Sequence, residues 1–150
     1  MEITTTFKIK AFVPSGSANA ETLFKLLEEL FSMLTREDIF KHVKENFGTS
    51  PDYPFKKFPN FAALRHESNE KWYGLIMNVL PEKLGLDGNN QIDVLNLKCP
   101  PEINGSLRNG KSILPGYHMD KENWISLVLE RLNAEEEVYN LIEQSFNLTK

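Results

Sequence analysis

The chain has 150 residues, of which 41% are hydrophobic and 25% charged, and its formal net charge is −4. These values are typical of a soluble globular protein, and no apolar run approaches the roughly 18 residues that a membrane span requires. The single cysteine, Cys99, excludes a disulfide framework and favours the reducing environment of the cytoplasm.

The first predicted elements are a strand and a helix within residues 1–33. FKIKAFV, residues 7–13, alternates apolar and polar side chains as a half-buried strand does. Ser and Asn residues in the following loop, PSGSAN, supply an N-cap for a helix over about 20–33. One face of that helix is apolar and consists of Leu23, Leu27, Leu30 and Phe31. We expect this pair to form an N-terminal extension that packs on the main domain.

A second helix should follow the first with almost no linker. Thr35-Arg36-Glu37-Asp38 has the form of a capping box, and Gly48 is a natural helix terminator. The apolar side of this helix is formed by Ile39, Phe40, Val43 and Phe47. The proline-broken loop TSPDYPFKKFPN then leads into the sheet.

The remaining segments predict a sheet with two further helices. FAALRHE and KWYGLIMNV form a hairpin across residues 68–70, and QIDVLNLKC is a buried strand with a bulge near Val94 and Leu95, where the alternation slips. EINGSLRNG is one or two helical turns, WISLVLE is a strand, and Asn133 caps a final helix. The chain is therefore predicted to be α+β, with an antiparallel sheet and helices from both ends packed on one face.

No motif for catalysis, cofactor binding or metal binding is present. The P-loop, G-x-G-x-x-G, nucleophile-elbow, HExxH and CxxC patterns are all missing from the sequence. None of the three histidines, His42, His66 and His118, has a second metal ligand at helical spacing. Cys99 has no base near it in sequence and is expected to be a buried thiol. We therefore expect no enzymatic activity, no cofactor and no metal ion.

Residues 113–124, ILPGYHMDKENW, concentrate the side chains best suited to binding. Residues 114–117 fit a type II turn with the glycine at positive φ. Asp120 is placed to cap a short helical turn that begins at Lys121, and N–H groups at a helix start can bind phosphate. Core packing would account for Met119 and Trp124, while packing and ligand contact both stay open for His118 and Lys121.

Two ordered motifs in this region resemble those of the YjbR/MmcQ family. Asn96-Leu97-Lys98-Cys99-Pro100-Pro101-Glu102 is similar to the family's N-L-K-C-D-P-E. Pro115-Gly116-Tyr117-His118-Met119-Asp120-Lys121, followed by Trp124, is similar to P-G-Y-H-[ML]-N-K-x-H-W. The similarity covers about residues 34–150 and leaves residues 1–33 outside it.

The resemblance implies a CyaY-like (frataxin-like) fold and a DNA-binding function in which β-hairpin wings engage the duplex. The chain departs from the family pattern where Asp120 replaces asparagine, where Asn123 replaces histidine, and where Ile125-Ser126-Leu127 replaces N-T-V. The first change keeps a capping side chain and adds a negative charge.

Three binding hypotheses follow from these residues. The first is contact with duplex DNA phosphates, although the net negative charge is unfavourable for it. Its candidate residues are Lys56, Lys57, Arg65, His66, Lys98, Arg108, Lys111, Tyr117, His118, Lys121 and Trp124. The alternative is a module for a small anionic ligand or a protein partner, with no nucleic-acid role, built from Lys98, Tyr117, His118, Lys121 and Trp124. A third hypothesis is a homodimer interface in the N-terminal extension.

Overall fold

The computed structural model describes residues 19–150, except for the side chains of residues 29–32. The strand predicted over residues 7–13 lies outside this range. The chain divides into two compact units, Met1–Met33 and Leu34–Lys150.

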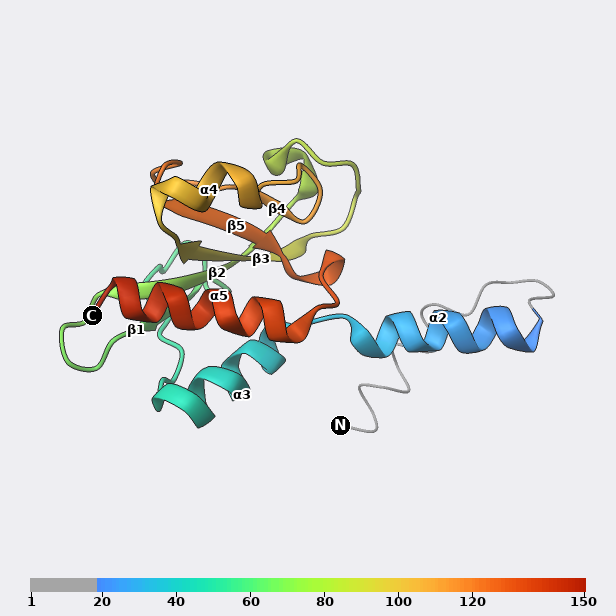
Figure 1. Cartoon of the computed structure of the whole chain (residues 1–150), viewed down its shortest axis with the longest axis horizontal. Helices are drawn as coiled ribbons and strands as arrows, with labels where there is room; N and C mark the ends of the chain where they lie inside the picture. Colours follow the sequence, from blue (N-terminus) through green and yellow to red (C-terminus); the bar gives the residue numbers. More distant parts are fainter. Residues whose placement is uncertain (1–18) are drawn as a thin grey trace. The chain divides into compact units, whose positions relative to one another are not determined.

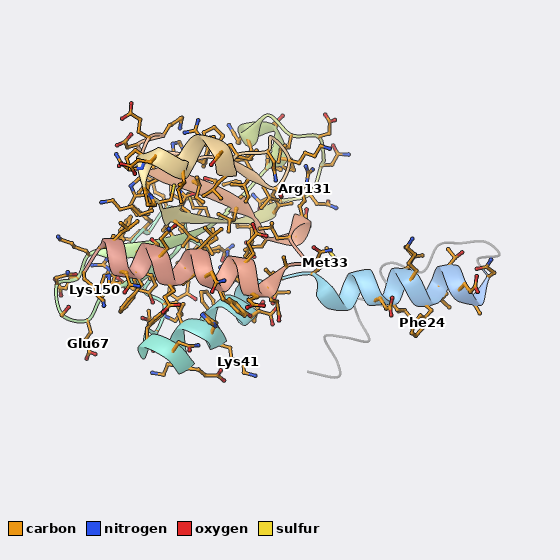
Figure 2. The ribbon with its side chains drawn as sticks, viewed as in Figure 1. Phe24, Met33, Lys41, Glu67, Arg131 and Lys150 are labelled. Atoms are coloured by element: carbon orange, nitrogen blue, oxygen red, sulfur yellow. The ribbon has the colours of Figure 1, made fainter. Side chains whose placement is uncertain are left out.

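The first unit contains the helix α2 (Ala20–Ser32), which agrees closely with the helix predicted from sequence. Asn19 acts as its N-cap, because Asn19 Oδ1 accepts a hydrogen bond from Thr22 N at 2.8 Å. Phe24 is 65% exposed and projects outward from the helix (Figure 2). The packing of this unit on the second and its use as a dimer interface stay predictions.

The second unit is a five-stranded sheet with three helices (Figure 1). The helices are α3 (Arg36–Phe47), α4 (Pro101–Leu107) and α5 (Glu135–Leu148). The strands are β1 (Ala62–Arg65), β2 (Trp72–Val79), β3 (Ile92–Lys98), β4 (Ile113–Pro115) and β5 (Trp124–Val128). Their order is β1-β2-β3-β5-β4, and every neighbouring pair is antiparallel. The predicted α+β class and antiparallel sheet are confirmed.

Both faces of the sheet are buried, and we name them by what covers them. On the helix face, strand residues pack with α3 and α5, and the cluster includes Ile39, Val43, Tyr73, Leu95, Leu97, Ile125, Leu127, Val138 and Ile142. On the loop face, Ala63, Leu75, Met77, Val94, Leu114 and Val128 pack beneath loop residues such as Phe55, Phe61, Leu84 and Leu86. The predicted packing of helices on one face is thus confirmed.

The bulge predicted near Val94 and Leu95 is wrong. β3 pairs without interruption with both neighbours, and the two side chains simply enter opposite cores. A strand buried on both faces can be apolar at consecutive positions, so its alternation slips without any change of register. The register shift lies instead in the β1–β2 hairpin, between Leu64 and Arg65.

The starts of α3 and α5 differ in how they are capped. The predicted capping box of α3 is confirmed, since Thr35 Oγ1 accepts from Asp38 N at 3.3 Å and Asp38 Oδ2 accepts from Thr35 N at 3.0 Å. The predicted cap of α5 by Asn133 is wrong. The N-cap position is Ala134, which has no capping side chain, and the first turn instead carries three glutamates that favour the helix dipole.

Candidate functional site

The strand topology brings the two sequence motifs to one end of the sheet. Lys98, the last residue of β3, pairs with Trp124, the first residue of β5, and β4 ends beside them at Pro115. Arg65 at the end of β1 pairs with Trp72 at the start of β2. Neighbouring strands are about 4.8 Å apart, so these residues form a row across the sheet. We call this row, together with the turn between β4 and β5, the motif end of the sheet.

The turn after β4 starts two residues later than predicted, over residues 116–119. The Gly116 carbonyl accepts a hydrogen bond from the amide three residues on, at 3.3 Å. His118 has the positive φ, +60°, whereas Gly116 does not. Glycine is needed at 116 for space, because a Cβ there would lie 2.7 Å from Trp124 Cβ and 2.9 Å from Trp124 O. The predicted type II turn over residues 114–117 is therefore wrong.

A buried triangle of hydrogen bonds fixes this turn to the sheet. Asn96 Nδ2 donates to Tyr117 O at 2.8 Å, and Tyr117 N donates to Ser126 Oγ at 2.8 Å. Ser126 Oγ in turn donates to Asn96 Oδ1 at 2.5 Å, and both of these side chains are fully buried. The asparagine of the first motif thus holds the backbone of the second. The sequence signal for this link is only that Asn96, a polar residue, stands between Leu95 and Leu97 in β3.

Short-range bonds hold the residues that follow the turn. Lys121 Nζ donates to Gly116 O at 2.7 Å, and Asp120 Oδ1 accepts from Glu122 N at 3.0 Å. A hydrogen bond from the Asn123 side chain at 2.5 Å is the main cause of the lowered pKa of Asp120. As predicted, Asp120 caps a single helical turn that begins at Lys121, since Trp124 N donates to Asp120 O at 3.0 Å. The Asp120 carboxylate already accepts from the free amide of this turn, Glu122 N. The local geometry therefore does not favour a phosphate at this position.

Two arginines near the motif end are engaged by the protein itself. Arg65 Nη2 pairs with Asp52 Oδ2 at 2.7 Å, and the guanidinium lies 5.7 Å from the centre of the Trp72 ring. Arg108 Nη2 donates to Lys121 O. Both side chains consequently serve to hold neighbouring segments in place.

Of the three remaining predicted lysines, two lie near the motif end and one does not. Lys56 and Lys57 are exposed in the loop before β1. The neighbouring Phe55 packs edge-on against Trp72, with ring centres 5.8 Å apart, which holds the start of this loop close to the motif end. Lys111 precedes β4 and therefore lies toward the opposite end of that strand. The structure does not bring it together with the others.

His66 is buried and does not face the predicted binding surface. It is 4% exposed, its Nε2 lies 2.6 Å from Thr149 Oγ1, and its ring centre is 4.2 Å from that of Phe146. Burial lowers the pKa of His66. The side chain ties the β1–β2 hairpin to the end of α5, so we leave it out of the binding surface.

The lowered pKa of His66 predicts a loss of stability in mild acid. Below about pH 6.5 the unfolded chain binds a proton at this residue that the folded chain does not, so unfolding becomes easier as pH falls. The measurement is the urea midpoint between about pH 7.5 and about pH 5.5 for the wild type and His66→Gln. The wild type should lose more stability than the variant. Burial also lowers the pKa of His42, but this residue is present in both proteins and therefore does not contribute to the difference between them. Equal losses would contradict the role of His66.

The described residues offer no sign of a metal centre or a reactive thiol. Within residues 19–150, no group of three His, Cys, Asp or Glu side chains is placed to hold a metal ion. No helix in this part of the chain is long and apolar enough to cross a membrane. Cys99 is buried, and burial raises the pKa of its thiol, which disfavours the thiolate.

Comparison with known proteins places this geometry among related chains. Residues 44–148 match the profile of the YjbR family. The chain is 78% identical over 118 residues to the uncharacterized protein YyaQ of Bacillus subtilis (strain 168), covering 79% of this chain and 100% of that protein. A crystal structure of a Pseudomonas syringae protein is 43% identical with a TM-score of 0.74, over 78% of this chain and 100% of that one. A Deinococcus radiodurans protein with a DUF419 domain shares the fold, with a TM-score of 0.60 at 24% identity, over 78% of this chain and 79% of that one.

Proposed function

Because this chain belongs to the YjbR family, we propose that it is a non-catalytic DNA-binding protein whose motif end contacts the phosphates of a duplex. The observation that supports the proposal is the convergence of Lys98, His118 and Lys121 where β3, β4 and β5 end or begin. Lys56 and Lys57 extend this group from the adjoining loop. A row of lysine side chains across strand ends is complementary to the charge of a phosphate backbone.

The distribution of carboxylates is compatible with this surface despite the net negative charge. The helices α3 and α5, which cover the helix face of the sheet, carry a series of acidic residues: Glu37, Asp38, Glu45, Glu135, Glu136, Glu137 and Glu143. At the motif end, Asp52 is paired with Arg65, and Asp120 accepts hydrogen bonds from Glu122 N and the Asn123 side chain. These two carboxylates are thus already engaged by the protein, whereas Glu122 in the turn and Glu67 and Glu70 in the β1–β2 hairpin are exposed negative charges at the same end of the sheet.

Fluorescence anisotropy of a labelled DNA duplex tests the proposal. If Lys56, Lys57, Lys98 and Lys121 each contact one phosphate, log affinity should fall against log salt with a slope of about −3 to −4. The titration should be made at several salt concentrations between about 50 mM and about 200 mM. Absence of binding at micromolar protein and low salt would remove the DNA-binding function.

A pair of matched double variants tests where the duplex lies. Lys57→Gln with Lys98→Gln should reduce the magnitude of the salt slope by about 2, because two phosphate contacts are lost. The control, Lys41→Gln with Lys44→Gln, makes the same charge change on α3, where Lys41 projects from the outer side (Figure 2). Equal weakening by both pairs would show that net charge, and not the motif end, controls binding.

A small anionic ligand at the turn has less support. The Glu122 N–H group that would bind it already donates to the Asp120 carboxylate.

A further inference from the structure

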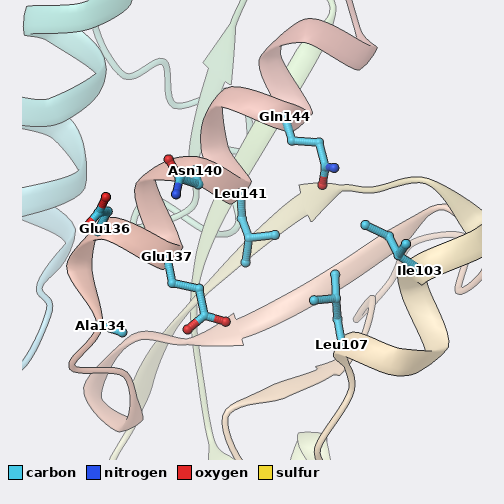
Figure 3. A pocket seen from close by; sticks show the side chains of 8 residues that line it. All are labelled: Ile103, Leu107, Ala134, Glu136, Glu137, Asn140, Leu141 and Gln144. Atoms are coloured by element: carbon cyan, nitrogen blue, oxygen red, sulfur yellow. The ribbon is translucent and has the colours of Figure 1, made fainter.

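A groove with an apolar floor lies between α4 and α5 (Figure 3). Its volume is about 530 Å³, and its lining includes Ile103, Leu107, Glu136, Glu137, Leu141 and Gln144. The apolar residues Leu107 and Leu141 pack against the core of the helix face. The groove therefore belongs to the opposite side of the sheet from the loop face.

The walls of the groove are two stripes at helical spacing. Ile103 and Leu107 are one turn apart on α4, and Glu137, Leu141 and Gln144 follow one another along α5. In Figure 3, Glu137 and Leu141 point toward the two α4 side chains. Ile103 is 36% exposed, although it is a large aliphatic residue. The groove thus has an apolar stripe on α4 and, on α5, Leu141 between two polar residues, and the apolar face of an amphipathic helix can bind in such a groove.

The polar groups of the groove specify the charge of such a helix. Glu136 and Glu137 are carboxylates, and the described lining contains no Lys or Arg. Gln144 Oε1 is buried and accepts no hydrogen bond from any residue in the described part of the chain. A buried acceptor without a donor is unfavourable, so a bound N–H or ammonium group would be stabilised there.

We propose that this α4–α5 groove binds a basic amphipathic helix of a partner protein. Aliphatic side chains of that helix contact Ile103, Leu107 and Leu141, and its Lys or Arg side chains lie beside Glu136 and Glu137. The chain's own α2 is a poorer occupant because its residues include Glu21, Glu28 and Glu29 against Lys25. The groove lining shares no residue with the proposed DNA surface, so each site can be tested by its own variants.

The test uses the full chain and a fluorescein-labelled model peptide of about 18 residues that repeats Leu-Lys-Lys-Leu. We expect saturable binding at micromolar concentrations. Glu136→Lys with Glu137→Lys should weaken binding by about tenfold or more, because attraction becomes repulsion. Ile103→Ser should also weaken it while the fold is kept, since this side chain is partly exposed. The control, Glu37→Lys with Glu45→Lys, makes the same charge change on α3 and should change affinity by less than about twofold.

Several outcomes would overturn the proposal. They are absence of saturable binding, equal weakening by the α3 control, and equal binding of a peptide with Glu in place of Lys. A concentration-dependent dimer that Ile103→Ser abolishes would assign the groove to a second copy of the chain instead. The variant with Glu136→Lys and Glu137→Lys should retain its affinity for a DNA duplex, which separates this site from the motif end.

Discussion

Replacing Asn96 with alanine is expected to lower the free energy of unfolding by about 3 kcal/mol, among the larger effects of a single polar substitution. The change removes two hydrogen bonds and leaves the partly buried Tyr117 O and the fully buried Ser126 Oγ without this partner. It also creates a small cavity beneath the turn. Urea unfolding measured by circular dichroism gives the difference directly.

The matched control is Asn147→Ala on the exposed side of α5, which should change stability by less than about 0.5 kcal/mol. If Asn96→Ala cost no more than this control, the triangle of Asn96, Tyr117 and Ser126 would not hold the turn. A folded Asn96→Ala protein should also bind DNA less tightly, because the backbone of the second motif would lose its anchor.

Gly116→Ala is expected to cost about 2–4 kcal/mol. The added methyl group would approach Trp124 Cβ to 2.7 Å and the Trp124 backbone to 2.9 Å, and a backbone in a paired strand cannot move aside without breaking the sheet. Thermal and urea unfolding should both show the loss.

Gly105→Ala provides the comparison on α4. A Cβ at Gly105 meets nothing within 4 Å, and alanine favours the helix, so stability should stay the same or rise by up to about 1 kcal/mol. Equal stability of the two alanine variants would show that Gly116 is not required for close contact with Trp124.

Elements with a local sequence signal could be predicted. The capping box at residues 35–38 and the hairpin of β1 and β2 depend on residues close together in the chain, and both agree with the structure. Alternating or continuous apolar runs gave the positions of β2, β3 and β5 for the same reason.

Elements decided by distant contacts could not be predicted. β4 has only three residues and exists because it pairs with β5, so Pro115 lies in a strand and not in the expected turn. The preference of proline and glycine for a turn is weaker than this pairing. His118 consequently adopts the left-handed conformation that the sequence assigned to Gly116.

The positions of the candidate site residues likewise depend on contacts between residues far apart in the chain. Arg65 and His66 are adjacent in sequence, but Arg65 lies over Trp72 while His66 is buried against Phe146. Spacing alone does not reveal which side of the hairpin α5 covers. Lys98 and Lys121, in contrast, belong to motifs that the family resemblance identified, and pairing of β3 with β5 brings them together.

The most direct test of the central claim is a titration of the ¹⁵N-labelled protein with a short DNA duplex at low salt, followed by amide chemical shifts. If the motif end binds the duplex, the shifts should concentrate at Lys56, Lys57, Lys98 and residues 116–124, while amides of α3 and α5 stay unchanged. Shifts confined to the helix face, or no shifts at all at saturating duplex, would contradict the claim that the motif end binds DNA.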